Sequence, residues 1–204
     1  MEVMETQEQI HEAAHSHHEG EHGGEGGGKR LVAIMISVLA CLLALVETGA
    51  NGSQSSQIAH NIEASDLWAF YQAKTIRKTT METVAELMEA SKPANLSTDQ
   101  EAVWSKRIAD WRNTAARYES EPDKGEGRKE LRARAIAAQK IRDKAAAAHH
   151  MFEYGAAALQ IAIVMASASV VTGTVMLVWG AGFLGVVGVA FGLLGWLAPT
   201  LIHL

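Results

Sequence analysis

The last fifty residues of the chain, 155–204, contain no Asp, Glu, Lys or Arg. A charge-free stretch of this length cannot form the surface of a soluble domain, where charged side chains are mostly found. As a single helix it would extend about 75 Å, whereas the hydrocarbon core of a bilayer is about 30 Å thick. We therefore expect residues 154–204 to form a transmembrane helical hairpin.

Two glycine-containing sites offer a turn for this hairpin, because glycine adopts turn conformations at little cost. Thr172-Gly173-Thr174 divides the stretch into spans near 154–172 and 175–198. Gly180-Ala181-Gly182 is the alternative.

A further apolar run, Leu31 to Val46, follows Lys29 and Arg30. Extended to Ala50, it reaches the length needed for a first transmembrane helix over residues 29–50. The competing interpretation is a cleaved signal peptide ending at Thr48-Gly49-Ala50. The long acidic segment upstream argues against cleavage, since signal peptides begin with a basic segment.

The segment between the spans, residues 51–153, has sixteen Lys and Arg against fifteen Asp and Glu. A first helix is expected from about Ser53 to Ala90, where Ser91-Lys92-Pro93 ends it. Its predicted packing stripe has helical spacing. The stripe comprises Ile58, Ile62, Ala69, Ala73, Ile76, Val84 and Leu87.

Two more helices complete this segment. The second begins at Ser97, with Gln100 placed for a capping box, and ends at the break over residues 121–125. Its stripe comprises Trp104, Ile108, Trp111, Ala115 and Tyr118. The third begins near Gly127 and continues into the second span. Its stripe comprises Leu131, Ala135, Ala138, Ile141, Ala145, Ala148 and Phe152.

The predicted fold is therefore all-α. It is an integral membrane protein with three transmembrane helices and a hairpin-like or coiled-coil-like helical domain between the first and second spans. The lipid bilayer is its first expected partner.

Each predicted span has a seam of small residues, which allow close helix approach in lipid. The first is Ala33, Ser37, Ala40 and Ala44; the second is Ala158, Ala162, Ala166, Ser169 and Gly173. The third, Gly185, Gly188, Gly192 and Gly195, is the most specific. It indicates packing inside the hairpin or, as the alternative, packing against another subunit. We also expect the chain to form a homo-oligomer.

Two polar residues in the spans are candidates for a function. Glu47 is the only formal charge between Leu31 and Ala50, and intramembrane carboxylates are functional candidates because burying charge in lipid is costly. It is expected to cap the span at the interface, with proton or ion handling as the alternative. Gln160 is expected to hydrogen-bond across helices.

The N-terminal residues 1–28 hold seven acidic residues, no Lys or Arg, and several histidines and glycines. This composition predicts a disordered tail. Imidazoles at helical spacing can bind divalent zinc, nickel or copper, so the tail is also a candidate for weak metal binding. The ligands would be His11, His15, His18 and His22.

The remaining chemistry points away from catalysis. Cys41, the only cysteine, lies in an apolar run that disfavours a thiolate, and no phosphate-loop, serine-hydrolase or zinc-protease motif is present. The net charge of −5 argues against a nucleic-acid partner. We expect no enzyme activity and no cofactor.

Three groups of residues resemble a known family. They are Glu47-Thr48-Gly49-Ala50 with residues 61–77, then residues 126–131, then residues 158–169. These strings resemble the bacterial family catalogued as domain of unknown function 4337, over roughly residues 29–198. The resemblance implies a bacterial inner-membrane protein with three spans, and it implies no activity.

Two functions remain open: an oligomeric membrane scaffold or assembly component, and a channel or transport component. The charges that flank the spans also give conflicting predictions of the membrane orientation. Lys29 and Arg30 favour a cytoplasmic N-terminus by the positive-inside rule, while Lys140, Arg142 and Lys144 favour a cytoplasmic helical domain. Because the first helix usually dominates, we expect a cytoplasmic N-terminus.

Overall fold

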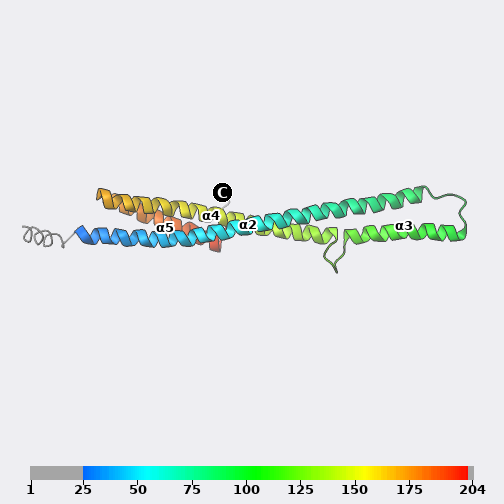
Figure 1. Ribbon diagram of the computed structural model, residues 1–204, viewed down its shortest axis with the longest axis horizontal. Helices are drawn as coiled ribbons and strands as arrows, with labels where there is room; N and C mark the ends of the chain where they lie inside the picture. The colour runs from blue at the N-terminus through cyan, green and yellow to red at the C-terminus, as the bar shows by residue number, and fades with distance from the viewer. Residues whose placement is uncertain (1–24, 202–204) are drawn as a thin grey trace, which may run out of the picture. The chain divides into compact units, whose positions relative to one another are not determined.

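The computed structural model describes residues 25–201, and within them every regular element is an α-helix. The helices are α2 (Glu25–Ala90), α3 (Thr98–Glu119), α4 (Arg128–Thr172) and α5 (Val175–Leu197), shown in Figure 1. The all-α class is confirmed. The histidine ligands predicted in the tail, His11, His15, His18 and His22, lie outside the described residues.

Three of the predicted helix boundaries are confirmed. Ser97 caps α3, with its side chain accepting from the Gln100 amide and the Gln100 side chain accepting from the Ser97 amide. The hairpin turn falls at Gly173, whose φ of 68° lies in the left-handed region that favours glycine. As expected, α4 runs without a break from Arg128 to Thr172.

One boundary differs from the sequence-based expectation. The predicted span 29–50 and the helix expected from Ser53 are a single helix, α2. Gly52 lies within it, where a Cβ would meet nothing within 4 Å, and no proline interrupts the backbone hydrogen bonding there.

The chain divides into two compact units. The apolar unit contains the described residues up to Asn51 together with those from Ala148 onward, and the polar unit is Gly52–Ala147. Helices α2, α4 and α5 are each long and apolar enough to cross a membrane.

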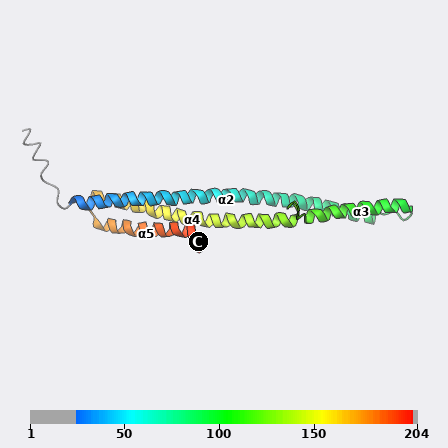
Figure 2. The same ribbon diagram turned by 90° about the horizontal axis from the view of Figure 1, so that it is seen from below.

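In the apolar unit, the start of α2, the end of α4 and the whole of α5 lie side by side (Figures 1 and 2). Their core contains Leu39 and Val46 of α2 with Phe152, Leu159 and Ala162 of α4. The small-residue seam predicted in the first span is on the outside, because the large side chains of Leu39 and Val46 face the glycines of α5 instead. Its exposed members are Ala33, Ser37, Ala40 and Ala44.

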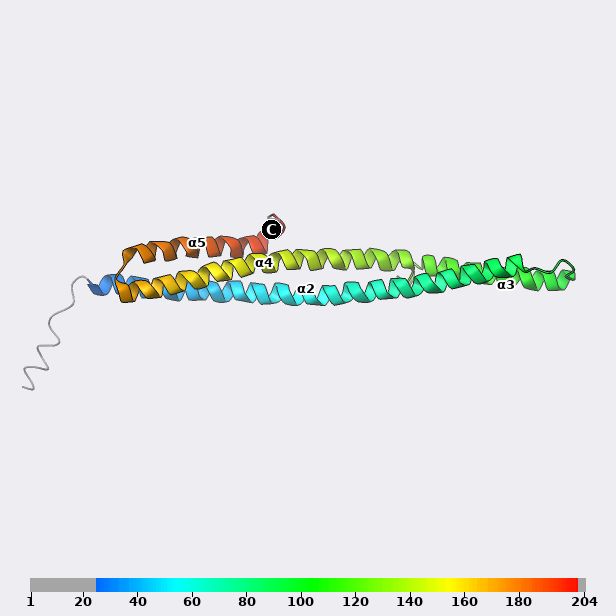
Figure 3. The ribbon, with the colours of Figure 1, turned by 90° about the horizontal axis from the view of Figure 1, so that it is seen from above.

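In the polar unit, α3 and the first part of α4 follow one another along the rest of α2 (Figure 3). Both run antiparallel to α2, because the Trp104 indole donates to the Met88 carbonyl while Arg142 lies near Asn61. A buried cluster joins α2 to α4 and comprises Ala64, Leu67, Leu131, Ala135 and Ala138.

The predicted stripe of α3 is confirmed, with Ile108 and Ala115 buried and the three aromatic residues partly buried. The stripe of α4 is confirmed except at Ile141, which is 48% exposed. The stripe of α2 is wrong: its large aliphatic residues lie outside, and polar residues occupy much of the inner face. The exposed members include Ile58, Ile62, Ile76 and Leu87.

Candidate functional site

The densest group of polar contacts in the polar unit lies where α3 ends and α4 begins. Helix α3 stops at Glu119, and α4 starts at Arg128 after a turn in which Gly125 has a φ of 66°. Gly127 is buried, and a Cβ there would overlap the backbone of Ser120 and Glu121. The turn therefore requires glycine at residue 127 for close packing.

Lys74 of α2 is 5% exposed and points into this turn. Its ammonium nitrogen lies 3.9 Å from a carboxylate oxygen of Glu121 and 3.7 Å from one of Glu126. The same nitrogen is 5.3 Å from the ring centroids of both Phe70 and Tyr118. A buried lysine needs this kind of compensation, because an isolated charge is costly to remove from water.

Arg128, the first residue of α4, connects both helices to α2. Its guanidinium donates to Glu119 at 2.8 Å, to the hydroxyl of Thr75 at 2.9 Å and to the hydroxyl of Tyr71 at 2.9 Å. Lys78 pairs with the same Glu119 carboxylate at 3.0 Å. One carboxylate from α3 therefore joins a cation of α2 to a cation of α4.

The charges of this group perturb one another's ionisation. The hydrogen bond from Lys78 holds the pKa of Glu119 below its ordinary value, with Arg128 adding to the effect, and the same bond raises the pKa of Lys78. The pKa of Glu130 is lowered because its carboxylate accepts from the Ser120 hydroxyl at 2.6 Å and from backbone amides. The ionised forms of Lys78, Glu119 and Glu130 are therefore favoured.

We call this group the joint cluster, and it brings together two of the stretches on which the family resemblance rests. Residues 61–77 supply its α2 members except Lys78, and residues 126–131 supply Glu126, Arg128 and Glu130. The members are Tyr71, Lys74, Thr75, Lys78, Glu119, Glu121, Glu126, Arg128 and Glu130. Sequence reasoning did not single out these residues as a site. The available signal was the spacing of Leu67, Tyr71, Lys74 and Lys78 on one helix face.

In the apolar unit, the structure brings together the two polar residues singled out from the sequence. The Gln160 amide donates from Nε2 to Oε1 of Glu47 at 3.3 Å, and both side chains lie on the outer surface. The pair therefore connects α2 to α4 on the side of this unit that a single chain leaves uncovered.

The four seam glycines of α5 are all buried. A Cβ would lie 2.7 Å from Leu39 at Gly185, 2.6 Å from Leu159 at Gly188 and 2.8 Å from Val46 at Gly192. At Gly195 it would lie 3.0 Å from the Phe152 ring. The seam therefore receives side chains from both α2 and α4, and these fill the space between the three helices.

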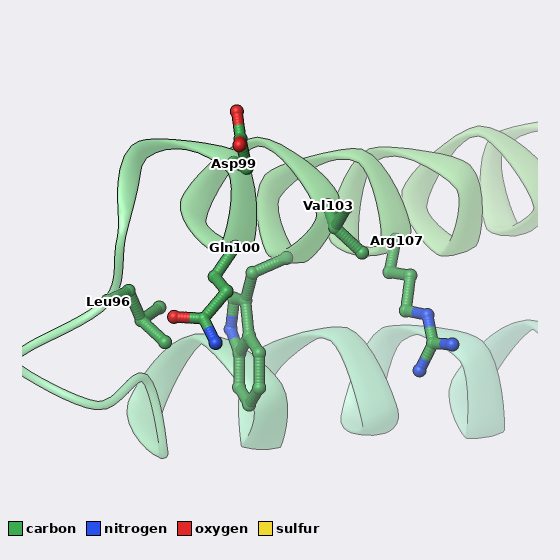
Figure 4. A pocket seen from close by; sticks show the side chains of 6 residues that line it. Leu96, Asp99, Gln100, Val103 and Arg107 are labelled. Atoms are coloured by element: carbon green, nitrogen blue, oxygen red, sulfur yellow. The ribbon is translucent and has the colours of Figure 1, made fainter.

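An open hollow lies beside the N-terminus of α3 (Figure 4). It is lined by Leu96, Asp99, Gln100, Val103, Trp104 and Arg107. Two of these side chains serve the fold itself, since Gln100 completes the capping box and Trp104 donates to the Met88 carbonyl. Among the residues that the structure describes, no three His, Cys, Asp or Glu side chains are grouped to hold a metal ion.

Comparison with known proteins gives a family. The search of curated proteins and the search of solved structures returned no match. The family model that matches covers residues 28–198, which include all three helices long enough to cross a membrane and the whole joint cluster. The chain belongs to the family described as Domain of unknown function (DUF4337).

Proposed function

We propose that this chain is a non-enzymatic, multi-pass protein of the bacterial inner membrane that assembles into a homo-oligomeric scaffold. The three apolar helices anchor it in the bilayer, and the polar unit stands outside the bilayer as a helical platform. Charge distribution supports this division, because residues 155–204 carry no formal charge while the polar unit contains most of the Lys and Arg.

The observation that carries this proposal is the packing of the apolar unit. Its glycine seam is occupied by Leu39, Val46 and Leu159, so the space between the helices of one chain is filled by apolar side chains. A water-filled path between these three helices would require polar groups along that space. Close packing of this kind suits an anchor better than a conduit.

The Glu47–Gln160 pair is the observation that would favour the alternative, a channel or transport component. It lies on the outer surface, so any path lined by it would have to form between subunits. In a scaffold the same pair takes a simpler role. Neighbouring copies shield it from lipid, which lowers the cost of a carboxylate at the edge of the bilayer.

Two measurements on the same purified protein distinguish the scaffold from the transport component: the mass of the oligomer and the flux of ions. The full chain is reconstituted in lipid nanodiscs for mass measurement and in vesicles for proton and potassium flux. We expect a defined oligomer and flux equal to that of protein-free vesicles. Flux that disappears in Glu47→Gln, with Glu153→Gln as the control, would establish the transport alternative. A monomer in nanodiscs would contradict the scaffold.

A further inference from the structure

The hydrogen bond between Gln160 and Glu47 fixes where the Glu47 carboxylate lies along the helices of the apolar unit. Gly49, Phe152 and Trp196 lie close to one level, because a Cβ on the glycine would contact both rings. Counted from this level at about 1.5 Å per residue, the Cα atom of Glu47 lies about 3 Å closer to the hairpin turn and that of Gln160 about 12 Å closer. The two side chains therefore reach toward one another along the helices, and their bond lies between these two levels.

Two tryptophans indicate where this bond lies relative to a bilayer. Trp179 and Trp196 are exposed near the two ends of α5, and tryptophan is enriched at both membrane interfaces. They are separated by about 25 Å of helix, which is close to the thickness of the hydrocarbon core. With the interfaces at these residues, the bond between Glu47 and Gln160 lies inside the hydrocarbon, within about two helical turns of its edge.

The bond leaves much of the hydrogen-bonding capacity of both side chains unused. Among the residues that the structure describes, Gln160 uses one of its two amide N–H groups and Glu47 accepts at Oε1 alone. Both side chains are exposed on the outer surface. Lipid tails cannot pair with these groups, and unpaired polar groups are costly in hydrocarbon. This surface therefore requires a partner that offers donors and acceptors at the same depth.

We propose that this partner is the same pair of side chains in a second copy of the chain, related by a two-fold axis along the membrane normal. The inference rests on the proposed function, in which copies share one membrane in one orientation. The bond within one chain shows that the Glu47 carboxylate and the Gln160 amide reach the same depth. In the pair of copies, α2 of each faces α4 of the other. Each copy donates a Gln160 N–H to the partner's Glu47 and accepts one in return, as a self-complementary interface requires.

The side chains next to this pair allow a second copy to approach. Ala40 and Ala44 lie about two turns and one turn before Glu47 on α2, and Ala157 lies about one turn before Gln160 on α4. All three are exposed, and small side chains allow close approach of helices in lipid. A lipid headgroup is a poorer partner, because it would have to leave the interface and enter the hydrocarbon to reach Gln160.

The first test is disulfide cross-linking of full-length chains in native membranes, in a Cys41→Ala background. Ala44→Cys and Ala157→Cys are placed on two chains with different tags, because these residues lie at one depth on the facing helices. We expect a mixed covalent dimer under mild oxidation. It should form at least ten times faster than the dimer of Leu45→Cys with Ala157→Cys. Leu45 is the matched control, because it is exposed at nearly the same depth on the side of α2 away from Glu47. Equal rates would overturn the proposal.

The second test measures the dissociation constant of the oligomer in lipid vesicles. Gln160→Leu removes the donors and should raise this constant at least fivefold, whereas Glu47→Gln retains an acceptor and should leave it within about twofold. Ser167→Ala is the control, because Ser167 is exposed on the same helix but its hydroxyl already donates to the Ile163 carbonyl. An equal dissociation constant for Gln160→Leu and Ser167→Ala would overturn the proposal.

Two outcomes separate this inference from the proposed function. A defined oligomer in nanodiscs that is equally stable in Gln160→Leu would overturn the contact between polar pairs and leave the scaffold intact. A parent chain that is monomeric in nanodiscs would overturn both.

Discussion

Arg128 donates from Nη2 to the hydroxyl of Tyr71 at 2.9 Å, and its guanidinium carbon lies 5.0 Å from the centroid of the same ring. The two residues are 57 positions apart in sequence, at the start of α4 and in the middle of α2. Their contact fixes α4 against α2 at the point where α3 ends. The break between α3 and α4 is therefore held by a charged and aromatic contact, where a short turn alone would leave the two helices free to separate.

Replacing Arg128 should weaken the polar unit. Arg128→Ala removes charge-assisted hydrogen bonds to Glu119, Thr75 and Tyr71, and we expect a loss of about 1.5–3 kcal/mol in the free energy of unfolding. Arg128→Lys should restore only part of it, because an ammonium cannot reproduce the planar guanidinium geometry. Thermal unfolding in detergent, followed by circular dichroism, measures the effect.

The control for this variant is Arg132→Ala, one turn along α4 at an exposed position. Arg132 takes part in none of the joint-cluster contacts. If both alanine variants unfold alike, the joint cluster contributes nothing specific to stability.

Acid should destabilise the same region. The pKa of Glu119 lies below its ordinary value of 4.5 in the folded chain, so its contribution is complete above that value and is lost as pH falls through the lowered pKa. Glu130 acts in the same direction. The raised pKa of Lys78 keeps its contribution until the pH rises above 10.5. We expect the unfolding temperature to be flat near neutral pH and to fall below about pH 4.5.

Glu119→Gln separates this effect from general acid denaturation. The variant should be less stable than the parent chain at pH 7, and the difference between the two should shrink as the pH falls toward 3. A difference that stays constant over this range would show that Glu119 ionisation does not contribute.

The parts of the fold that follow from local sequence could be predicted. Ser97 and Gln100 define a helix cap within one turn, and Gly173 supplies the turn between α4 and α5. The stripe of α3 consists of aromatic and apolar residues, and these form its packed face. The inner face of α2 could not be predicted in this way. Its Tyr71, Lys74 and Lys78 are polar, and their partners Arg128, Glu121 and Glu119 lie 40 or more positions away.

Contacts between residues distant in sequence also explain why the candidate sites could not be predicted in full. Periodicity identified the aliphatic residues of α2 correctly as one stripe, but it could not show which face the remaining helices would cover. The covered face carries the apolar Ala64, Leu67 and Ala85 together with Lys74, whose ammonium pairs with Glu121 and Glu126. Gln160 and Glu47 were visible as isolated polar residues in apolar runs, while their hydrogen bond depends on the antiparallel register of α2 and α4.

The glycine seam should tolerate no side chain where α2 packs on it. At Gly192 a Cβ would lie 2.8 Å from Val46, so Gly192→Ala should cost about 1–3 kcal/mol through overpacking. The larger Gly192→Leu and Gly188→Leu should disrupt the helix packing outright. Thermal stability and particle size in detergent measure both effects.

Two variants test whether the contact with Val46 causes the loss of stability in Gly192→Ala. Gly182→Ala is the matched control, because nothing lies within 4 Å of a Cβ at that position of the same helix. Val46→Ala combined with Gly192→Ala should regain part of the lost stability, since it removes the methyl groups that clash. Equal stability of Gly182→Ala and Gly192→Ala would contradict this packing.

One labelling experiment determines on which side of the membrane residues 1–28 and the polar unit lie. Lys29 and Arg30 precede the first span, and the first helix usually sets the orientation, so we expect residues 1–28 in the cytoplasm and the polar unit on the outer side. Ser91, exposed in the turn after α2, is replaced by cysteine in a Cys41→Ala background, with Ser16→Cys as the opposite reporter. An impermeant maleimide applied to cells with an opened outer membrane should label residue 91 and spare residue 16. Labelling of residue 91 only after the inner membrane is permeabilised would reverse the orientation and place the polar unit in the cytoplasm.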